Sequence, residues 1–221
     1  MLQDNSGNNI CSLTGKIVGE PVFSHEVFNE GFYNIDLEVP RLSQAYDVLP
    51  VTVSERIMDR SIFTLGSYLR LTGQIRSYNN YVESEGRNRL IITVFARDYD
   101  PLDEEPPRGV NEVFLNGYIC KQPMYRTTPF GREIADLLVA VNRSYNKSDY
   151  IPCITWGRNA RFSGKLNVSD NIKLWGRMQS RGYQKKYEDG TIVDKTAYEV
   201  SVSKIEVPSS EEDGEEENYF I

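Results

Sequence analysis

The chain has 221 residues, of which 39% are hydrophobic and 26% charged, and its net charge is −7 at pH 7. This length predicts two domains of about a hundred residues each. No apolar run reaches the roughly 20 residues of a membrane-spanning helix, and the N-terminus lacks the basic start and apolar core of a secretory signal. The three cysteines have no metal-like spacing, so we expect reduced thiols in a cytoplasmic protein without a metal or other cofactor.

The charge is distributed unevenly along the chain. Residues 1–110 carry 10 basic and 16 acidic side chains, and residues 111–205 carry 15 basic and 9 acidic ones. Residues 206–221 carry 7 acidic side chains and no basic one. A basic segment therefore lies between an acidic segment and an acidic end, and it is the local charge that attracts phosphates.

The predicted elements, in chain order, form two units. Residues 1–10 predict a disordered N-terminus, and 11–97 a first unit with alternating hydrophobic strands and a short helix at 55–63. Residues 98–111, rich in proline and acid, predict a linker. The second unit, 112–207, has strands predicted at 112–119, 133–142, 150–156, 171–180 and 196–207, with a short helix at 159–166. The composition of 208–221 predicts a disordered acidic tail.

The two units resemble each other at an offset of about 102 residues. Matching segments are 13–15 with 115–117, 48–50 with 150–152, and 71–73 with 174–176. A repeat of this length indicates a duplicated domain rather than a solenoid. Five strands with a helix between the third and fourth are typical of the oligonucleotide-binding (OB) barrel. The predicted fold is all-β: two tandem five-stranded OB-fold barrels, each with that short helix, followed by the tail.

Aromatic and cationic side chains alternate along the second unit, as in surfaces that bind an unpaired nucleic-acid strand. Bases stack on rings for roughly 1–3 kcal/mol each, and cations follow the phosphates. Core packing is the competing interpretation for rings in strands, and Trp175 either extends the platform or caps the barrel. The candidate contacts are Arg132, Arg143, Tyr145, Lys147, Tyr150, Trp156, Arg158, Lys173, Trp175, Arg181, Tyr183 and Lys185.

No arrangement of residues indicates an enzyme. The sequence lacks a Ser/His/Asp set and a glycine-rich phosphate loop, and its one histidine, His25, is expected in a surface hairpin. The acidic run 98–105 is interpreted as solvated charge rather than a metal site, because it lies in a predicted linker.

The segments LNGYICKQPMYRTTPFGREIADLLVAVNRSYNKSDYIPCITWGRNA and KLWGRMQSRGYQKKYEDG closely resemble the bacterial single-stranded DNA-binding protein family. Shared features are the glycine-turned hairpin, the Ala-Val-Asn-Arg strand end, and Gly-Arg-x-x-x-Arg before an aromatic residue. The resemblance covers nearly all of residues 113–207, and the first unit looks like a diverged relative. Two barrels in one chain resemble those members that form homodimers with four barrels.

This resemblance implies sequence-independent binding and protection of single-stranded DNA in replication, recombination and repair, in the cytoplasm at the nucleoid. The stacking rings it implies are Tyr145, Tyr150, Trp156 and Tyr183. Their counterparts in the first unit are Ser43, Val48, Ser54 and about Asn80, so we expect that unit to be mainly structural.

The resemblance also implies that the tail recruits replication and repair proteins. The tail residues assigned to docking are Glu215, Glu216, Glu217, Tyr219, Phe220 and Ile221. Two alternatives stay open: an OB-fold adaptor of the primosome type that works mainly through protein contacts, and an accessory nucleic-acid domain of an enzyme.

Overall fold

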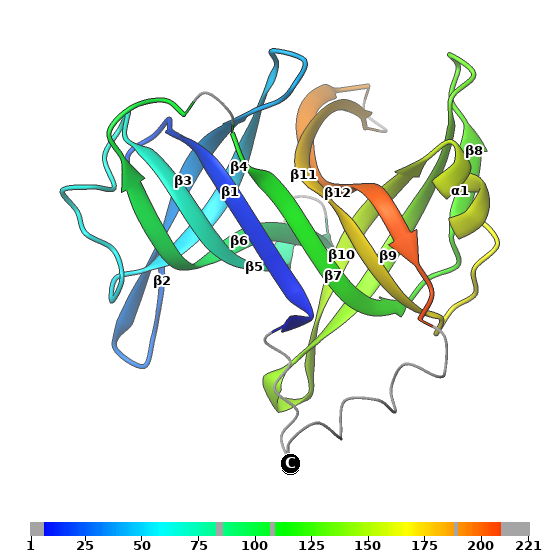
Figure 1. Cartoon of the computed structure of the whole chain (residues 1–221), viewed down its shortest axis with the longest axis horizontal. Helices are drawn as coiled ribbons and strands as arrows, with labels where there is room; N and C mark the ends of the chain where they lie inside the picture. The colour runs from blue at the N-terminus through cyan, green and yellow to red at the C-terminus, as the bar shows by residue number, and fades with distance from the viewer. Residues whose placement is uncertain (1–6, 83–85, 107–108, 188–189, 209–221) are drawn as a thin grey trace, which may run out of the picture.

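The computed structural model describes residues 7–82, 86–106, 109–187 and 190–208. In these residues the strands form one 12-stranded sheet that curls into two barrels, one for each sequence unit (Figure 1). The two barrels lie side by side, and strands β1 and β7 run along the junction between them.

The first barrel is closed by five strands. Its elements are β1 (Asn9–Ile17), β2 (Val22–Val27), β3 (Glu30–Pro40), β4 (Tyr46–Ser54), β5 (Tyr68–Val82) and β6 (Arg87–Leu102). Around the barrel the order is β1, β3, β4, β6 and β5, with β5 returning to β1. Only the pairing of β4 with β6 is parallel among these strands. The sixth strand, β2, is a short edge strand in a hairpin with β3.

The second barrel repeats this order strand for strand. Its elements are β7 (Asn111–Ile119), β8 (Met124–Thr127), β9 (Glu133–Arg143), β10 (Lys147–Trp156), α1 (Arg158–Ser163), β11 (Asn171–Lys186) and β12 (Ile192–Glu206). The parallel pair is β10 with β12, and β8 is the edge strand beside β9. Two five-stranded barrels of this kind are OB-folds. The predicted all-β fold of two tandem OB-fold barrels is therefore confirmed.

The helix predicted at 55–63 is wrong: these residues form consecutive turns. The Oδ1 atom of Asp59 accepts hydrogen bonds from the backbone N–H and the hydroxyl of Ser61, at 2.8 and 2.6 Å. Such local bonds compete with a helical ladder. Phe63 nevertheless fills the barrel end, where it is buried and packs edge-on against Tyr99, with ring centroids 4.7 Å apart.

The helix predicted at 159–166 exists but is displaced and shorter, as α1. Ala160 and Ser163 are its buried residues, and the Ser163 hydroxyl lies 2.7 Å from the Thr155 hydroxyl of β10. The spacing of Phe162 and Leu166, four residues apart, predicts one apolar helix face, and this prediction is half right. Leu166, which follows the helix, is buried, but Phe162 is 43% exposed.

Two predicted boundaries are also wrong. Residues 98–102, expected in the linker, continue β6 and pair with residues 68–72. Asn9 and Ile10, expected in the disordered N-terminus, belong to β1. Asn9 is ordered because its side chain exchanges two hydrogen bonds, of 2.8 and 2.9 Å, with the backbone of Ile75.

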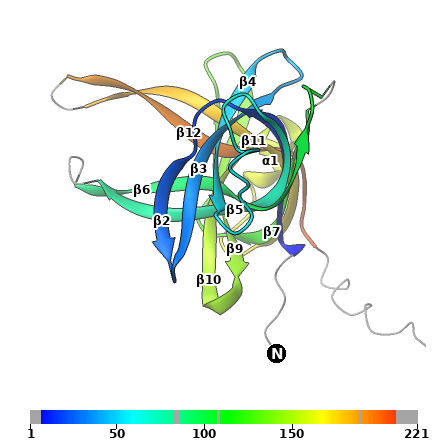
Figure 2. The same cartoon turned by 90° about the vertical axis from the view of Figure 1, so that its left-hand side faces the viewer.

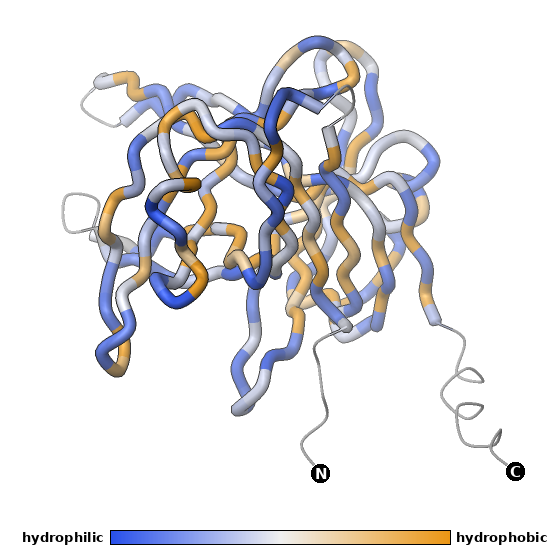
Figure 3. Tube along the Cα trace, turned by 60° about the vertical axis from the view of Figure 1, so that its left-hand side comes forward, coloured by the Kyte–Doolittle hydropathy of each residue, from blue (hydrophilic) through white to orange (hydrophobic). Residues whose placement is uncertain are grey.

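Each barrel is filled by the inward side chains of its alternating strands, and hydrophobic and hydrophilic residues alternate along the chain trace (Figure 3). Leu13, Leu37 and Val51 are completely buried in the first barrel, as are Leu115 and Val139 in the second. Removing such side chains from water is the main favourable term in folding. It fixes the register, because a one-residue slip would turn every apolar side chain outward.

Two of the three cysteines belong to this interior rather than to a reactive site. All three are free, and Cys11 and Cys153 are buried. Burial raises the pKa of Cys11 to about 12. Its thiol therefore stays protonated and unreactive at neutral pH.

The barrels are joined by an antiparallel pair of β1 with β7, in which Asn9 lies opposite Leu115 and Leu13 opposite Asn111. Asn111 repeats the role of Asn9 at the 102-residue offset. Its amide exchanges two hydrogen bonds of 2.8 Å with the backbone of Met178. The junction thus has approximate twofold symmetry, as if two chains had been fused.

A buried carboxylate supports each side of the junction. Asp47 on β4 is completely buried and accepts bonds from Arg41 of its own barrel. It also accepts bonds from the other barrel: from Arg177 at 3.2 Å and from the backbone N–H and hydroxyl of Ser180 at 2.6 and 3.0 Å.

Asp149 on β10 is the counterpart of Asp47, 102 residues later. It is completely buried and accepts a bond from Arg143 of its own barrel at 3.3 Å. From the first barrel it accepts bonds from Arg76 at 2.9 Å and from the Ser77 backbone N–H at 2.8 Å. A buried charge is tolerated only when it is paired and hydrogen-bonded in this way. The two carboxylates therefore fix how the barrels sit together.

Candidate nucleic-acid interface

Strand β10 presents two rings on the outside of the second barrel. Tyr150 is 45% exposed and Trp156 is 38% exposed, whereas Ile151, Cys153 and Thr155 point inward and are buried. The indole N–H of Trp156 donates to the Ser201 hydroxyl on β12 at 3.3 Å. The ring therefore lies across the neighbouring strand with part of its surface open to solvent.

Tyr145 lies in the turn that joins β9 and β10. It is 84% exposed, and its backbone adopts a left-handed conformation with φ of 62°. Non-glycine residues rarely take this conformation. The β9–β10 hairpin projects beyond the barrel (Figure 1), so it carries this ring away from the body of the sheet.

Tyr183 lies on β11 where the strand leaves the barrel and continues as a hairpin with β12. It is 37% exposed and pairs with Lys195. Further along the same arm, the Lys185 ammonium lies 4.4 Å from the centre of the Tyr187 ring, in a cation–π contact. The β5–β6 and β11–β12 hairpins project on the same side of the molecule (Figure 2).

The predicted cations fall into two groups. Arg132, Lys147 and Arg158 are exposed around the β10 rings, and Lys173 on β11 is half-buried. Arg143 and Arg181 instead have internal partners. Arg143 contacts the buried Asp149, as described above.

Arg181 forms an ion pair with Glu199, whose side chain is 7% exposed, at 3.1 Å. The hydrogen bond that Arg181 donates to this carboxylate, together with the carboxylate's charge, raises the pKa of Arg181 against the opposing effect of burial. The guanidinium groups of Arg143 and Arg181 therefore hold the fold together, and they contribute positive charge to the surface only through their exposed edges.

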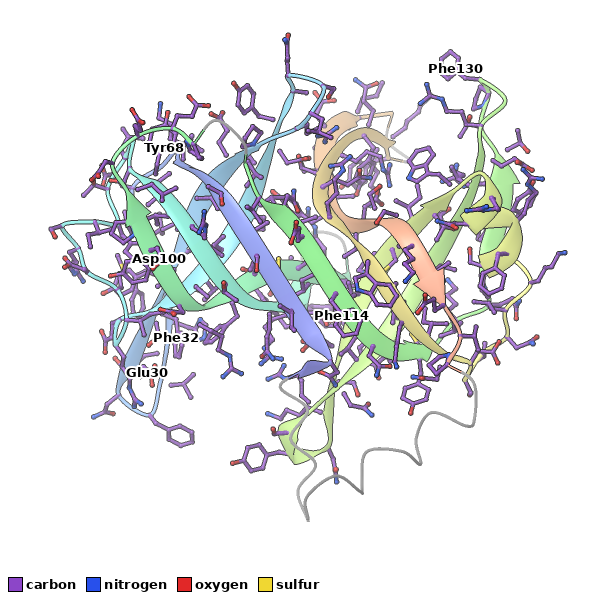
Figure 4. All side chains as sticks on the ribbon, viewed as in Figure 1. Glu30, Phe32, Tyr68, Asp100, Phe114 and Phe130 are labelled. Atoms are coloured by element: carbon purple, nitrogen blue, oxygen red, sulfur yellow. The ribbon has the colours of Figure 1, made fainter. Side chains whose placement is uncertain are left out.

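Trp175 lies on the outside of β11 and does not cap the barrel. Its ring packs against Phe114 of β7 with centroids 5.2 Å apart, and the Lys204 ammonium lies 4.4 Å from the ring centre. Phe114 is labelled in Figure 4. Sequence reasoning missed Phe114, although its place opposite Trp175 in the β7–β11 pairing follows once the barrel order is known.

Phe130 is a second exposed ring that sequence reasoning missed. It is 91% exposed at the tip of the β8–β9 hairpin and points away from the barrel (Figure 4). The signal was present in the repeat, because Phe28, which is 97% exposed at the tip of the β2–β3 hairpin, precedes it by the same 102 residues.

In the first barrel, the counterparts of the stacking rings carry no ring. Ser43 and Asn80 are exposed, and Val48 is 38% exposed. Ser54 is buried, and its hydroxyl donates to the Glu30 carboxylate. The docking residues proposed for the tail, 215–217 and 219–221, lie outside the described residues.

Within the described ranges, no helix is long and apolar enough to cross a membrane. The same residues contain no group of three or more His, Cys, Asp or Glu placed to hold a metal ion.

Comparison with known proteins gives matches centred on the second barrel. Residues 110–208 match the Single-strand binding protein family. Single-stranded DNA-binding protein 1 of Staphylococcus aureus is 35% identical over 82 residues, which cover 34% of this chain and 49% of that protein. Single-stranded DNA-binding protein A of Bacillus subtilis is 34% identical over 87 residues, covering 34% and 48%. The chain thus spans about half the length of these relatives.

A solved structure resembles nearly the whole chain. The wild-type single-stranded DNA binding protein from Thermus aquaticus superimposes with a TM-score of 0.71 at 19% identity, covering 91% of this chain and 93% of that one. This likeness supports the two-barrel fold, including the diverged first barrel.

Proposed function

We propose that this chain, whose second barrel belongs to the single-strand binding protein family, binds single-stranded DNA without regard to sequence. Bases stack on the rings of the second barrel, and exposed cations contact the phosphates. This mechanism requires no contact with base edges, because every base has a π-face and the phosphates are uniform. It is a binding function and includes no catalytic step.

One observation carries the proposal: large rings remain partly exposed on the outer face of β10, on a well-packed barrel. Tyr150 and Trp156 are not needed to fill the interior, which smaller side chains of the same strand occupy. An exposed aromatic surface flanked by Lys147 and Arg158 is what an unpaired strand requires. The family match of residues 110–208 supports the same conclusion.

Replacing Trp156 tests the proposal. The Trp156→Ala variant is expected to weaken binding of oligo-dT by about 1–3 kcal/mol, or roughly 5- to 150-fold, because one stacked base is lost. Trp156→Phe, which keeps a ring, should retain most of the affinity. Ser54→Ala, at the matching position of the first barrel, is the control and should change affinity less than about twofold.

The natural fluorescence provides the readout, because both tryptophans of the chain lie in the second barrel. Oligo-dT is expected to quench this fluorescence at low salt. If the fluorescence and the Trp156→Ala affinity both stay unchanged, the stacking mechanism is wrong, and the adaptor that works through protein contacts becomes the better explanation. Preference for structured RNA over oligo-dT would instead favour the accessory domain of an enzyme.

The finer parts of the function belong to the same proposal. We propose that the protein protects DNA during replication, recombination and repair, in the cytoplasm at the nucleoid, and that it assembles as a homodimer with four barrels. The acidic tail, which ends in Tyr219, Phe220 and Ile221, is proposed to recruit partner proteins: its acids attract basic surfaces, and its apolar tip inserts. Mass measurement in solution, with and without oligo-dT, tests the assembly.

A further inference from the structure

The first barrel carries its own row of rings, at positions that the repeat does not predict. Phe32 on β3 packs against Phe95 on β6, with ring centroids 5.9 Å apart. On its other side, Phe32 is stacked on His25 of β2, with centroids 4.9 Å apart and planes only 13° from parallel. Three rings from three strands thus form a continuous row on the outside of the barrel. His25 is exposed, whereas Phe32 and Phe95 are half-buried.

The register of the two barrels shows that this row occupies the place of Trp156. In the second barrel Ile154 pairs with Ser201, and in the first Thr52 pairs with Phe95, so Phe95 stands where the second barrel has Ser201. Ser54 stands where the second barrel has Trp156.

The two barrels therefore carry their rings on different strands at this place in the sheet. In the second barrel, a ring on the central strand reaches over a serine of the neighbouring strand, from Trp156 to Ser201. In the first barrel, Phe32 and Phe95 come from the strands on either side of β4 and meet across it, while Ser54 lies buried on β4 opposite Phe32. Both barrels thus place an aromatic surface on the same part of the sheet.

The surroundings of the row include an ion pair with an exposed arginine and a second exposed arginine. The Glu30 carboxylate, which lies near Phe32 at the same end of the barrel (Figure 4), is paired with Arg56 at 2.9 Å. The Arg56 side chain is 72% exposed, at the position that matches Arg158 of the second barrel. Arg97 lies at a β-bulge two residues beyond Phe95 on β6, where its exposed side chain donates a hydrogen bond to the Gln74 amide oxygen at 2.8 Å. Both guanidinium groups keep an exposed part that a phosphate backbone crossing the row can contact.

We propose that the first barrel is a second binding site for single-stranded DNA, in which bases stack on the His25–Phe32–Phe95 row and the phosphates contact Arg56 and Arg97. This rests on the proposed function, which it extends from one barrel to both. A strand that leaves the rings of the second barrel continues over the first, so that long strands gain contacts which short strands cannot reach.

The test compares variants of the row with short and long oligonucleotides, because one OB-fold covers only about 4–16 nucleotides. Phe95→Ser gives the first barrel a serine at this position, as the second barrel has with Ser201. This variant and His25→Ala are expected to weaken binding of an oligo-dT long enough for both barrels, roughly 30 nucleotides, on the order of fivefold or more. Binding of an oligo-dT of about 8 nucleotides, held mainly by the second barrel, should stay within twofold.

The matched control is Phe23→Ala. Phe23 is a ring on the same strand as His25, but it packs edge-on against Tyr33 instead of joining the row. Phe23→Ala should leave the affinity for both oligonucleotides unchanged. The double variant Ser54→Trp with Phe95→Ser returns a ring to the central strand, as in the second barrel, and is expected to restore binding of the long oligonucleotide. This rescue separates lost stacking from lost folding.

The outcomes distinguish this inference from the proposed function. One outcome is that Trp156→Ala weakens the binding of both oligonucleotides while Phe95→Ser and His25→Ala weaken the binding of neither. In that case the first barrel does not stack bases, and only this inference is overturned. If Trp156→Ala also has no effect, the proposed function itself fails. Loss of long-oligonucleotide binding that the double variant does not rescue would likewise contradict the stacking row.

Discussion

At the scale of single residues, two groups of arginines differ in what they contact. The Arg158 side chain is exposed beside Trp156, where a phosphate can reach it. Arg143 lies only 15 residues earlier, yet its guanidinium contacts the completely buried Asp149. Both arginines were predicted to contact DNA, because the sequence around a cation does not show whether a buried carboxylate lies beside it.

This difference predicts different effects on salt dependence. The affinity of a protein for single strands falls with salt by a slope of about −0.7 for each neutralised phosphate. Arg158→Ala is expected to reduce that slope by about one contact while leaving thermal stability nearly unchanged. Arg143→Ala should instead lower the unfolding temperature, because Asp149 loses a partner. Equal effects of the two variants on the salt slope would contradict this assignment.

Asp47 shows how a buried charge can still be ionised. Burial acts to raise its pKa, but hydrogen bonds from Arg41 and from Ser180 outweigh this effect and hold the pKa of Asp47 below its ordinary value of 3.8. A carboxyl with a depressed pKa in the folded state stabilises the fold above its unfolded pKa. That stabilisation is lost as the pH falls through the folded value.

We therefore expect Asp47→Asn to reduce the free energy of unfolding by about 3 kcal/mol at pH 7, because both arginines at this site lose a buried charged partner. The difference from the natural protein should begin to narrow as the pH falls below about 4, where this carboxyl becomes protonated in the unfolded chain, and should disappear only as the pH falls through the lower folded-state pKa of Asp47. Urea unfolding at pH 7 and at pH 3 measures both values. The exposed Asp100→Asn is the control, expected within about 0.5 kcal/mol at either pH. A difference that stays constant with pH would contradict the linkage.

At the scale of elements, each barrel closes through a short seam at which a glycine is required. The second barrel closes where Tyr118 and Ile119 of β7 pair with Ala140 and Val139 of β9. A Cβ atom on Gly117 would lie 2.5 Å from the Ala140 carbonyl oxygen. Gly117 belongs to one of the segments matched in the repeat. The repeat does not show its role, which is to let two strands approach closely and not to form a turn.

Gly117→Ala is accordingly expected to destabilise the protein by about 1–3 kcal/mol, because the strands of the seam must move apart. Gly182→Ala, on the exposed arm of β11 where an added Cβ meets nothing within 4 Å, is the matched control. Thermal unfolding followed by circular dichroism compares the two. Equal melting temperatures would show that the seam accommodates a side chain.

At the scale of the whole molecule, the two barrels form one sheet and share two buried carboxylates. They are therefore expected to unfold together as a single cooperative unit, although each is large enough to have its own core. Both tryptophans, Trp156 and Trp175, lie in the second barrel, so their fluorescence reports on that barrel alone.

A substitution in the first barrel tests this coupling. In Gly15→Ala the added Cβ collides with the backbone oxygen of Glu38 at the seam of the first barrel. If the barrels unfold together, the tryptophan fluorescence of the second barrel reports the same lowered melting temperature as circular dichroism of the whole chain. An unchanged fluorescence transition alongside a lowered dichroism transition would mean that the barrels unfold independently.

The sequence by itself determined the features that are written locally or periodically along the chain. The 102-residue repeat, the alternation of apolar residues and the turn glycines were enough for two OB-fold barrels and for exposed rings at Tyr150 and Trp156. The helix predicted at 55–63 failed because Asp59 bonds locally to Ser61, a competition that composition does not reveal.

Only the tertiary structure decided which side chains meet across strands. Phe32 and Phe95 are 63 residues apart and match no ring in the second barrel, yet they pack together because β3 and β6 flank the same strand. In the same way, Asp149 accepts hydrogen bonds from Arg76 and Ser77 of the first barrel, more than 70 residues earlier, and its burial there explains why Arg143 also contacts it. The physical reason is that strand pairing brings distant segments together. Aligning the two units residue by residue compares Trp156 with Ser54, and so it misses rings that the first barrel carries on the neighbouring strands.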